Sequence, residues 1–427
     1  MNPSLKVLII GSGGREHALL KACLNSPMVE KAWAAPGNGG MQAEAECHPL
    51  DVENPSDCVT LARELGANFV IVGPEVPLAL GVADDLRAAG IATYGPGRDG
   101  AVLESSKAAC KAFFKKYDIP TADWDTFTQV EPALEYLQRF TLPVVVKASG
   151  LAAGKGVLIC ETMEAAEEAV RGMLEEDSFG ASGQEIVIEE FLTGQEASIM
   201  VLVSGSKYVC LAPSQDHKRV GEGDTGLNTG GMGAYAPAAV VTESVMKIVH
   251  KDIIGPTLEG FEAEGIDFRG TLFVGLMIDD AGQPKVLEYN VRFGDPECQV
   301  LLPLCETDPV QLMWDCANGT LEPEEVRMKD KSAVIVVLAA KGYPGSYPKN
   351  DPIVLPGDLP ADLSIVHAGT KLDANGQLLS TGGRVLGVVS MADTLKEAAA
   401  KAYSVCDAVQ WENKYFRRDI GHRQLKN

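Results

Sequence analysis

The chain has 427 residues, of which 46% are apolar, and its formal net charge is −22 at pH 7. This length allows two to four domains with sizeable cores, and no stretch reaches the uninterrupted apolar length of a membrane span. The negative charge argues against a nucleic-acid partner, so an anionic substrate has to be held by a local positive site. Ten cysteines without a C-x-x-C pair predict a reduced protein of the cytoplasm.

Predicted strands and predicted helices alternate through the first hundred residues. The run KVLII at 6–10 leads into glycines and lacks a signal-peptide cleavage site, so we interpret it as the first strand. Further strands are expected at 68–75 and 91–95, with helices before and between them. This alternation predicts a doubly wound parallel sheet, in which ligands bind beyond the carboxyl ends of the strands.

Two glycine-containing turns lie at such strand ends, GSGGREH at 11–17 and GPEVPL at 73–78. Gly11 and Gly13 fit the dinucleotide-binding fingerprint, but Glu16 takes the place of its third glycine. A helix N-terminus still offers free N–H groups to a single phosphate, which suits a sugar phosphate better than NAD. The alternative is a plain β–α turn without a ligand.

A second unit follows a predicted helix at 104–118 and contains the stretch GLAAGKGV at 150–157. Its glycines and Lys155 resemble a P-loop, but only three residues separate Gly150 from Gly154, and Gly156 follows the lysine. Because strands are expected on both sides, at 142–148 and 157–160, we predict a glycine hairpin that covers phosphate groups. An ordinary flexible hairpin with two solvated lysines is the alternative.

The end of the predicted strand VIEEFL at 187–192 can offer backbone N–H and C=O groups to an adenine ring, with Phe191 and Leu192 near the ring face. A buried strand followed by exposed acidic residues is the competing interpretation. Beyond it, residues 214–235 have few apolar side chains and are expected to form a long functional loop. Asp216, His217 and Lys218 at its start can receive a zwitterionic substrate, although His217 taken alone is typical of a structural residue.

The segment VLEYNVRFGDPE at 286–297 is the most informative. Side chains alternate along a strand, so Glu288 and Asn290 share one face and Arg292 follows on the same side. A carboxylate and an amide oxygen suit Mg²⁺, and an arginine beside them can hold a migrating phosphoryl group. The alternative is the solvated face of an edge strand.

Eight motifs, in this order along the chain, resemble those of the phosphoribosylamine–glycine ligases, also called glycinamide ribonucleotide synthetases. The resemblance runs from residue 6 to about residue 421 and is therefore close to full length. The motifs are KVLIIGSGGREHAL, APGN, VGPEVPLALGVADDL, GLAAGKGV, EEFLTGQEAS, SQDHKRVGEGDTGLNTGGMGAY, LEYNVRFGDPE and STGGRVLGVV.

This resemblance implies an α/β and α+β multidomain protein. An N-terminal doubly wound domain (1–103) would precede an ATP-grasp centre (104–325, with a lid subdomain at about 121–192) and a small C-terminal α+β domain (326–427). The implied reaction belongs to purine biosynthesis: glycine takes the γ-phosphoryl group of ATP, and the amine of 5-phosphoribosylamine attacks the resulting glycyl phosphate. Mg²⁺ or Mn²⁺ would be the cofactor, and the protein would be a monomer or weak dimer without nucleic-acid or membrane partners.

The resemblance also implies roles for particular residues. Glu288 and Asn290 would bind the metal. The set that would bind ATP is Lys107, Lys147, Gly150, Gly154, Lys155, Gly156, Glu189, Glu190, Phe191, Leu192 and Glu196. The set that would bind the substrates is Gly13, Gly14, Arg15, Glu16, Asn38, Pro74, Glu75, Arg292, Gly294 and Asp295. The catalytic set would be Arg292, Lys155, Asp216, His217 and Lys218.

Two departures from the family pattern stand out. Ser149 lies before the glycine hairpin where the resemblance leads us to expect Asp. The strand TLFVGLMID at 271–279 is apolar up to Asp279, so a third acidic metal ligand is not expected. We expect both the hairpin at 148–156 and the segment 214–235 to be mobile without ligands.

Three other functions remain open at this point. Another ATP-grasp ligase or carboxylase of purine synthesis would use bicarbonate in place of glycine, and the Asp216–Lys218 cluster favours glycine. An NAD-dependent dehydrogenase is disfavoured by the incomplete fingerprint at 11–16. A non-catalytic nucleotide sensor is disfavoured by the full set of metal and phosphate groups.

Overall fold

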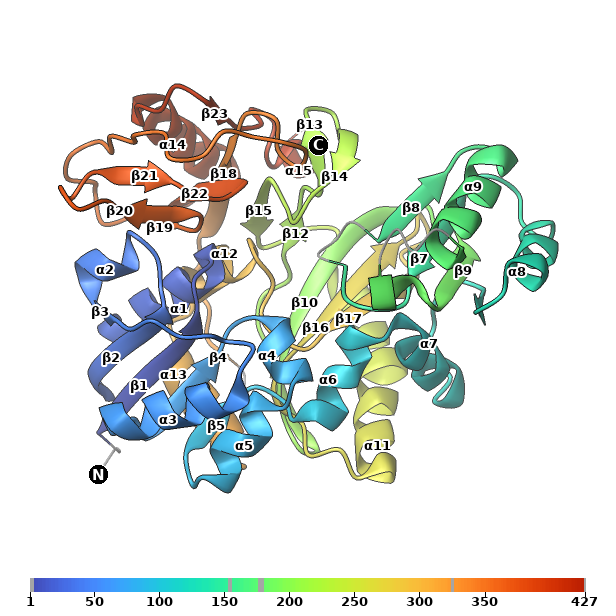
Figure 1. Ribbon diagram of the computed structural model, residues 1–427, viewed down its shortest axis with the longest axis horizontal. Helices are drawn as coiled ribbons and strands as arrows, with labels where there is room; N and C mark the ends of the chain where they lie inside the picture. Colours follow the sequence, from blue (N-terminus) through green and yellow to red (C-terminus); the bar gives the residue numbers. More distant parts are fainter. Residues whose placement is uncertain (1–3, 153–155, 176–179, 324–325, 426–427) are drawn as a thin grey trace.

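The computed structural model describes residues 4–152, 156–175, 180–323 and 326–425. In Figure 1 the N-terminal sheet lies below the C-terminal sheet, and part of the central region projects to the right as a separate lobe. None of the helices in the described ranges is both long enough and apolar enough to cross a bilayer.

The N-terminal residues form a five-stranded parallel sheet, as predicted. Alternate residues of its central strand enter two different cores: Val7 and Ile9 face one, Leu8 and Ile10 the other. The sheet is therefore covered on both faces, which explains the continuous apolar runs. In sheet order the strands are β3 (Glu46–Cys47), β2 (Val29–Pro36), β1 (Leu5–Gly11), β4 (Phe69–Val72) and β5 (Ala92–Tyr94). The helices of this region are α1 (Gly14–Asn25), α2 (Met41–Glu44), α3 (Pro55–Leu65), α4 (Glu75–Ala79), α5 (Val82–Ala88) and α6 (Arg98–Ser105).

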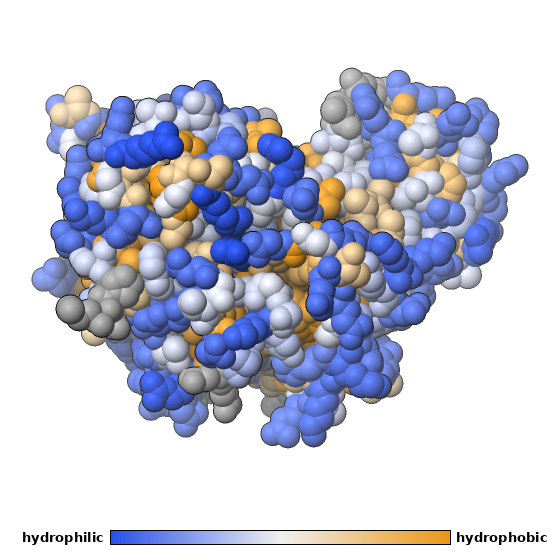
Figure 2. Space-filling model, turned by 90° about the horizontal axis from the view of Figure 1, so that it is seen from below, coloured by the Kyte–Doolittle hydropathy of each residue, from blue (hydrophilic) through white to orange (hydrophobic). Residues whose placement is uncertain are grey.

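The central region contains two antiparallel four-stranded sheets, which we call the lid sheet and the body sheet. The lid sheet has its own apolar core with two helices, and it forms the lobe on the right of Figure 1. Figure 2 shows the surface hollowed between this lobe and the main body. The lid elements are β6 (Trp124–Phe127), α8 (Val130–Leu137), β7 (Val144–Ala148), β8 (Val157–Cys160), α9 (Met163–Leu174), the short 3₁₀ helix η1 (Gly180–Gly183) and β9 (Ile186–Glu190).

The body sheet has the order β11-β10-β16-β17. The helical run at 243–264 contains a π-helical stretch. The helix expected at 104–118 is shorter, because Ser106 caps a new helix by accepting a hydrogen bond from the Ala109 N–H. The body elements are α7 (Lys107–Lys116), β10 (Gln195–Ser204), β11 (Lys207–Cys210), α10 (Glu243–Ile248), η2 (Val249–Ile254), α11 (Gly255–Glu264), β16 (Arg269–Ile278) and β17 (Pro284–Asn290).

The C-terminal sheet corrects one expectation. Residues 214–235 are not a structureless loop, because they contribute two strands to this sheet and a separate hairpin. The sheet consists of β12 (Gln215–Asp216), β15 (Gly233–Ala236), β18 (Ser332–Ala340), β22 (Arg384–Ala392), β19 (Leu363–His367) and β23 (Lys414–Tyr415). The remaining elements are β13 (Arg219–Gly221), β14 (Thr225–Asn228), α12 (Cys298–Leu304), α13 (Pro309–Asn318), β20 (Thr370–Leu372), β21 (Leu378–Ser380), α14 (Leu395–Ala408) and α15 (His422–Leu425).

Candidate active site

The carboxyl end of β17 carries the two predicted metal ligands. Glu288 and Asn290 are half-buried, whereas Tyr289 between them is fully packed into the core. The pairing of β17 with β16 slips by one residue just before Glu288, which is a β-bulge. Such bulges re-aim side chains next to functional sites, and here Glu288 and Asn290 both face away from the core.

Cations surround the Glu288 carboxylate without bonding to it. Burial alone would raise its pKa, but neighbouring positive charges lower it below its ordinary value. In the part of the chain that the structure describes, no donor makes a hydrogen bond or ion pair with this carboxylate, so its oxygens are available to a divalent ion. The Asn290 Oδ1 is a second hard oxygen ligand, and the pair fits Mg²⁺. The surrounding cations are Lys218, Lys147, Lys107 and Arg292.

The Arg292 guanidinium is held in place by carboxylates from two other segments. Its Nη2 donates to Glu104 Oε1 at 2.6 Å, and its Nε donates to Glu75 Oε2 at 3.3 Å. Glu104 also accepts a hydrogen bond at 2.7 Å from the N–H of Val291. Burial raises the pKa of Glu104 to about 7, against the opposing charge of Arg292. Arg292 is thus fixed beside Asn290, whose Oδ1 lies 3.3 Å from Nη2.

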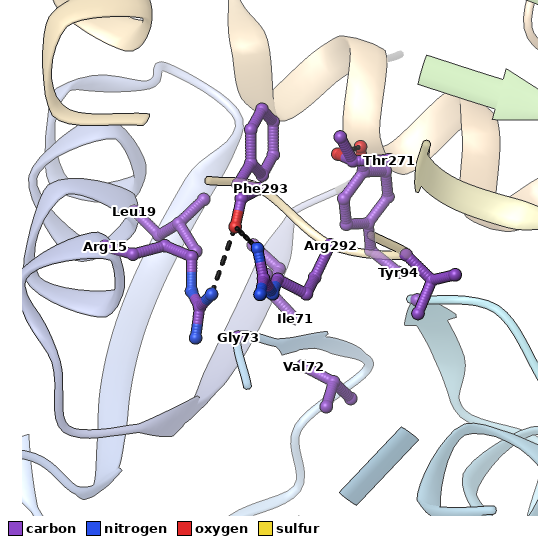
Figure 3. Close-up of a pocket in the computed structure, with 11 residues that line it drawn as sticks. Arg15, Leu19, Ile71, Val72, Gly73, Tyr94, Thr271, Arg292 and Phe293 are labelled. Atoms are coloured by element: carbon purple, nitrogen blue, oxygen red, sulfur yellow. Dashed lines mark hydrogen bonds between the residues drawn. The ribbon is translucent and has the colours of Figure 1, made fainter. Parts of the chain in front are cut away.

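A second arginine meets Arg292 in a small pocket (Figure 3). Arg15, in the first turn of α1, donates from Nη1 to the carbonyl oxygen of Phe293 at 3.0 Å, and Arg292 donates to the same oxygen at 3.3 Å. Tyr94 and Thr271 line the same pocket. The structure therefore brings together Arg15, Glu75 and Arg292, which were predicted from three separate motifs.

The turn before α1 is built around Glu16. Its carboxylate accepts hydrogen bonds from the Gly13 N–H at 2.6 Å and from Arg15 Nε at 2.6 Å. A Cβ at Gly11 or Gly73 would lie 2.5 Å or 2.1 Å from atoms of this side chain. The glycines therefore make room for Glu16, which stabilises the turn from the position of the missing third glycine.

In the lid, Glu189 lies between two buried lysines. Lys111 Nζ is 2.6 Å from Glu189 Oε2, and Lys147 pairs with Oε1. Burial opposes ionisation of Glu189, but the two lysines lower its pKa below the ordinary value. These three groups together carry a net positive charge, and the charge of Lys147 also lowers the pKa of Glu288.

The glycine hairpin begins at a contact between the lid and α7. Ser149 Oγ accepts a hydrogen bond from the Ala108 N–H at 3.1 Å, in the first turn of α7, and Lys107 Nζ donates to the Gly150 carbonyl at 3.1 Å. An aspartate at 149 would be able to accept the same helix N–H, which gives a physical reason why serine is compatible here. Gly156 lies against the side chain of Ala152, and Gly154 and Lys155 lie outside the described residues.

The end of β9 is tied to the segment before β6 and to β17. The Glu190 N–H donates to the Asp123 carbonyl, and the Glu190 carboxylate lies 3.6 Å from Lys285 Nζ. The strand ends there. Phe191 is half-buried and Leu192 is buried.

Asp216 and Lys218 form a chain of charges with Glu196. Lys218 Nζ lies 3.3 Å from Glu196 Oε2 and 3.4 Å from Asp216 Oδ2. Glu297, which is buried at the start of α12, interacts electrostatically with both Asp216 and Lys218. A Cβ at Gly294 would lie 2.3 Å from the Glu297 carboxylate, so glycine there leaves space for this side chain.

His217 points to the opposite side from its neighbours. Its ring is fully buried, its Nε2 accepts a hydrogen bond from the Gly421 N–H at 2.9 Å, and its Nδ1 lies 3.5 Å from Asp224 Oδ1. The structure therefore does not bring His217 together with Asp216 and Lys218 at the substrate side of the strand.

The other predicted residues lie around the turn of α1. Asn38 is buried and bonds backbone groups, donating to the Ser12 carbonyl at 2.9 Å, so its side chain connects segments. Asp295 pairs with Arg384 at 3.2 Å and lies near Gly14, the first residue of α1. Pro74 directly precedes α4 and its Glu75.

Three buried charged residues of this site did not emerge from the sequence: Glu104, Lys111 and Glu297. Glu104 lies in α6, Lys111 lies in α7, and Glu297 directly precedes α12. A charged residue on the buried face of a predicted helix would have indicated them, because burying an unpaired charge is costly and such a residue needs a partner.

Glu297 gives the protein a measurable dependence of stability on pH. Burial, reinforced by the charge of Asp216, raises its pKa from 4.5 to about 7. Between these values the folded carboxyl keeps a proton that the unfolded chain has lost, so its contribution lowers the free energy of unfolding as the pH rises. We expect Glu297→Gln to gain about 1–3 kcal/mol relative to the parent between about pH 5 and about pH 8 in denaturant titrations.

The matched control is Glu306→Gln, at an exposed position close in sequence. It should follow the pH dependence of the parent. A Glu297→Gln profile parallel to the parent at all pH values would show that the Glu297 carboxyl titrates normally.

Comparison with known proteins gives a consistent assignment. Sequence models for phosphoribosylglycinamide synthetase match in order: the N domain at 5–104, the ATP-grasp (A) domain at 105–298 and the C domain at 333–423. The phosphoribosylamine–glycine ligase of Agrobacterium fabrum is 48% identical over 421 residues, and that of Salmonella typhimurium is 46% identical over 425 residues. In both cases the match covers 99% of each chain.

Solved structures agree with these matches. A crystal structure of phosphoribosylamine–glycine ligase from Thermotoga maritima has a TM-score of 0.84 at 35% identity, covering 97% of this chain and 100% of that one. A biotin carboxylase domain from Hydrogenobacter thermophilus, solved with MgADP, has a TM-score of 0.75 at 17% identity, covers 97% of this chain and 92% of that one, and shares the fold alone. The N-terminal parallel sheet, ATP-grasp centre and C-terminal domain are therefore confirmed. With this identity over almost its whole length, the chain belongs to the phosphoribosylamine–glycine ligase family.

Proposed function

We propose that this protein joins glycine to 5-phosphoribosylamine, using ATP, in purine biosynthesis. The glycine carboxylate attacks the γ-phosphorus of ATP and gives glycyl phosphate and ADP. The amine of 5-phosphoribosylamine then attacks the acyl carbon, phosphate leaves, and glycinamide ribonucleotide results. The observation that carries this proposal is the cluster at the end of β17, where Glu288 and Asn290 lie beside an Arg292 fixed by Glu75 and Glu104.

The residues around the hollow between the lid and body sheets have the chemistry that ATP requires. Lys147 and Lys107 place positive charge near Glu288, and the edge after β9 can hold the base with Leu192 against its face. The reaction needs charge neutralisation and alignment of the attacking oxygen, and the chain's cations and its fixed Arg292 serve both needs. Lys155, outside the described residues, is proposed to act on the phosphates from the glycine hairpin.

Glu288 and Asn290 are proposed to hold Mg²⁺ or Mn²⁺. A bound divalent ion would neutralise charge on the phosphates and help align them for in-line transfer. The carboxylate oxygens of Glu288, which accept no hydrogen bond from the described residues, and the lowered pKa of this group are what the ion needs from the protein.

Substrate recognition is proposed to divide between two groups of residues. Asp216 and Lys218 carry opposite charges and suit the amine and carboxylate of glycine. Arg15 and the N-terminus of α1 suit the phosphoribosyl group. Arg292, which shares the Phe293 carbonyl with Arg15, would stabilise charge on the acyl phosphate as the amine attacks.

We further propose that the protein works in the cytoplasm, because all ten of its cysteines are free. Its partners are proposed to be its small-molecule substrates, without nucleic acid, since its net charge is −22. For its assembly we propose a monomer or weak dimer, which sedimentation at several protein concentrations would test.

The deciding experiment measures ADP formation with each substrate omitted in turn. We expect ADP only when ATP, Mg²⁺, glycine and 5-phosphoribosylamine are all present, with glycinamide ribonucleotide formed in equal amount. A parallel assay replaces glycine by bicarbonate, which an ATP-grasp carboxylase would use. Absence of ADP above background with the complete mixture would refute the proposal, and bicarbonate-dependent ADP would assign the protein to the carboxylases.

A further inference from the structure

The segment 214–225 carries the proposed glycine-binding residues on one side and a buried ionic cluster on the other. Asp216 and Lys218 face Glu196, whereas His217 between them faces the C-terminal residues 415–423. The C-terminal segment also donates hydrogen bonds to backbone carbonyls that flank His217 and Lys218. The first comes from Arg423, which donates to the Asp216 carbonyl at 2.9 Å. The orientation of the proposed substrate-binding side chains thus depends on contacts from a distant part of the chain.

Arg417 makes the second backbone contact. It is fully buried, and its Nη1 donates to the Arg219 carbonyl at 2.9 Å and to Asp224 Oδ1 at 3.0 Å. Its Nε and Nη2 donate to the two oxygens of Asp419, each at 2.8 Å. This two-pronged geometry fixes the guanidinium plane and with it the position of the Arg219 carbonyl.

Asp224 is the centre of the cluster. Its Oδ2 accepts from Arg423 Nη2 at 2.9 Å, and its Oδ1 accepts from Arg417. Burial would raise the pKa of this carboxyl, but hydrogen bonds with His217 and Arg417 and the charge of Arg423 lower it. Asp224 adopts a left-handed backbone conformation, with φ at +57°, which aspartate tolerates better than most residues other than glycine.

The same cluster looks like a metal site at first sight, since ligand atoms of His217, Asp224 and His422 lie within 4.8 Å of one another. The hydrogen bonds argue against that assignment. His217 Nε2 already accepts from the Gly421 N–H, and both oxygens of Asp224 accept from guanidinium groups. Two nearby arginines would also repel a cation.

We propose that the C-terminal residues 415–423 brace residues 216–219, which include the proposed glycine-binding residues Asp216 and Lys218. Asp224 and Arg417 are then positioning residues, which set the affinity for the amino-acid substrate without touching it. This inference rests on the proposed function of Asp216 and Lys218. Breaking the brace frees the carbonyls of Asp216 and Arg219, so the side chains between them lose their shared orientation. The ATP site around Lys147 and Glu189 is held by separate contacts and stays intact.

The test replaces Asp224 by asparagine, which keeps the shape of the side chain and removes its charge. We expect the KM for glycine to rise about tenfold while the KM for ATP changes less than about twofold. Hydrogen exchange at 216–221 should become faster without any substrate present. The control is Asp407→Asn, which breaks the exposed ion pair with Arg418 on the same segment and should leave both KM values and the exchange rates unchanged.

A milder variant keeps the test usable if Asp224→Asn does not fold. Tyr415→Phe removes one hydrogen bond, from the tyrosine hydroxyl to the Val220 carbonyl at 2.8 Å, and should raise the glycine KM by about twofold with faster exchange at 216–221. Equal rises in both KM values, or a lower melting temperature with an unchanged glycine KM, would overturn the proposal. If the parent forms no glycine-dependent ADP, the proposed function fails, and the exchange measurement still decides whether the brace exists.

Discussion

Replacing Glu288 by alanine is expected to lower the turnover number by at least about a hundredfold while leaving the protein folded. The carboxylate is half-buried at the end of β17 and has no hydrogen bond from the described residues, so its loss breaks no structural contact there. It is also the negative group on which the charges of Lys218, Lys147 and Lys107 converge. Without it, a divalent ion would have to bind to the Asn290 amide and the phosphates alone.

The measurement is Mg²⁺-dependent ADP formation, with thermal unfolding recorded on the same preparation. Glu259→Ala, on the exposed face of α11, is the matched control and should keep parent activity. Near-normal Mg²⁺-dependent turnover in Glu288→Ala would remove Glu288 from the metal site. A large loss of melting temperature would instead show that Glu288 has a structural role among the lysines.

The overall architecture followed from local patterns, and its exceptions have identifiable causes. The alternation of apolar runs and helices in the first hundred residues predicted the parallel sheet, because each βαβ unit is a local feature. The hairpin between β7 and β8 was also predicted, since its two strands are close in sequence. The strands within 214–235 were missed because they are only two to four residues long, and because β15 pairs with β18 about a hundred residues later.

The residues of the candidate site also divide into those that local sequence predicted and those that depend on distant contacts. Glu288, Asn290 and Arg292 were predicted together because strand alternation is visible within five residues of sequence. Glu104 and Lys111 were missed because their partners, Arg292 and Glu189, lie far along the chain and only the fold brings them near. The orientation of the His217 side chain could not be predicted from residues 214–235, because it depends on a hydrogen bond from Gly421 near the C-terminus.

Of the substitutions proposed here, Glu189→Gln is expected to lower the free energy of unfolding the most. The carboxylate is buried between Lys111 and Lys147, and the amide would leave two buried ammonium groups without their shared counter-charge. Breaking a buried ion pair by removing one partner costs about 3–5 kcal/mol. Because the lysines also hold the pKa of Glu189 below its ordinary value, its contribution to stability is present at neutral pH and is lost as the pH falls into the acidic range.

The stability cost should therefore be largest at neutral pH and shrink as the pH falls through the lowered pKa of Glu189. Denaturant titrations of the parent and the variant at a series of pH values, from neutral into the acidic range, measure this difference. Glu135→Gln, at an exposed position on the lid helix α8, is the control and should cost less than about 0.5 kcal/mol. The KM for ATP should also rise, because Lys147 loses the group that orients it. An unchanged stability with a raised KM would mean that the two lysines lose their protons in the variant, and that Glu189 acts on ATP affinity through their charge rather than on folding.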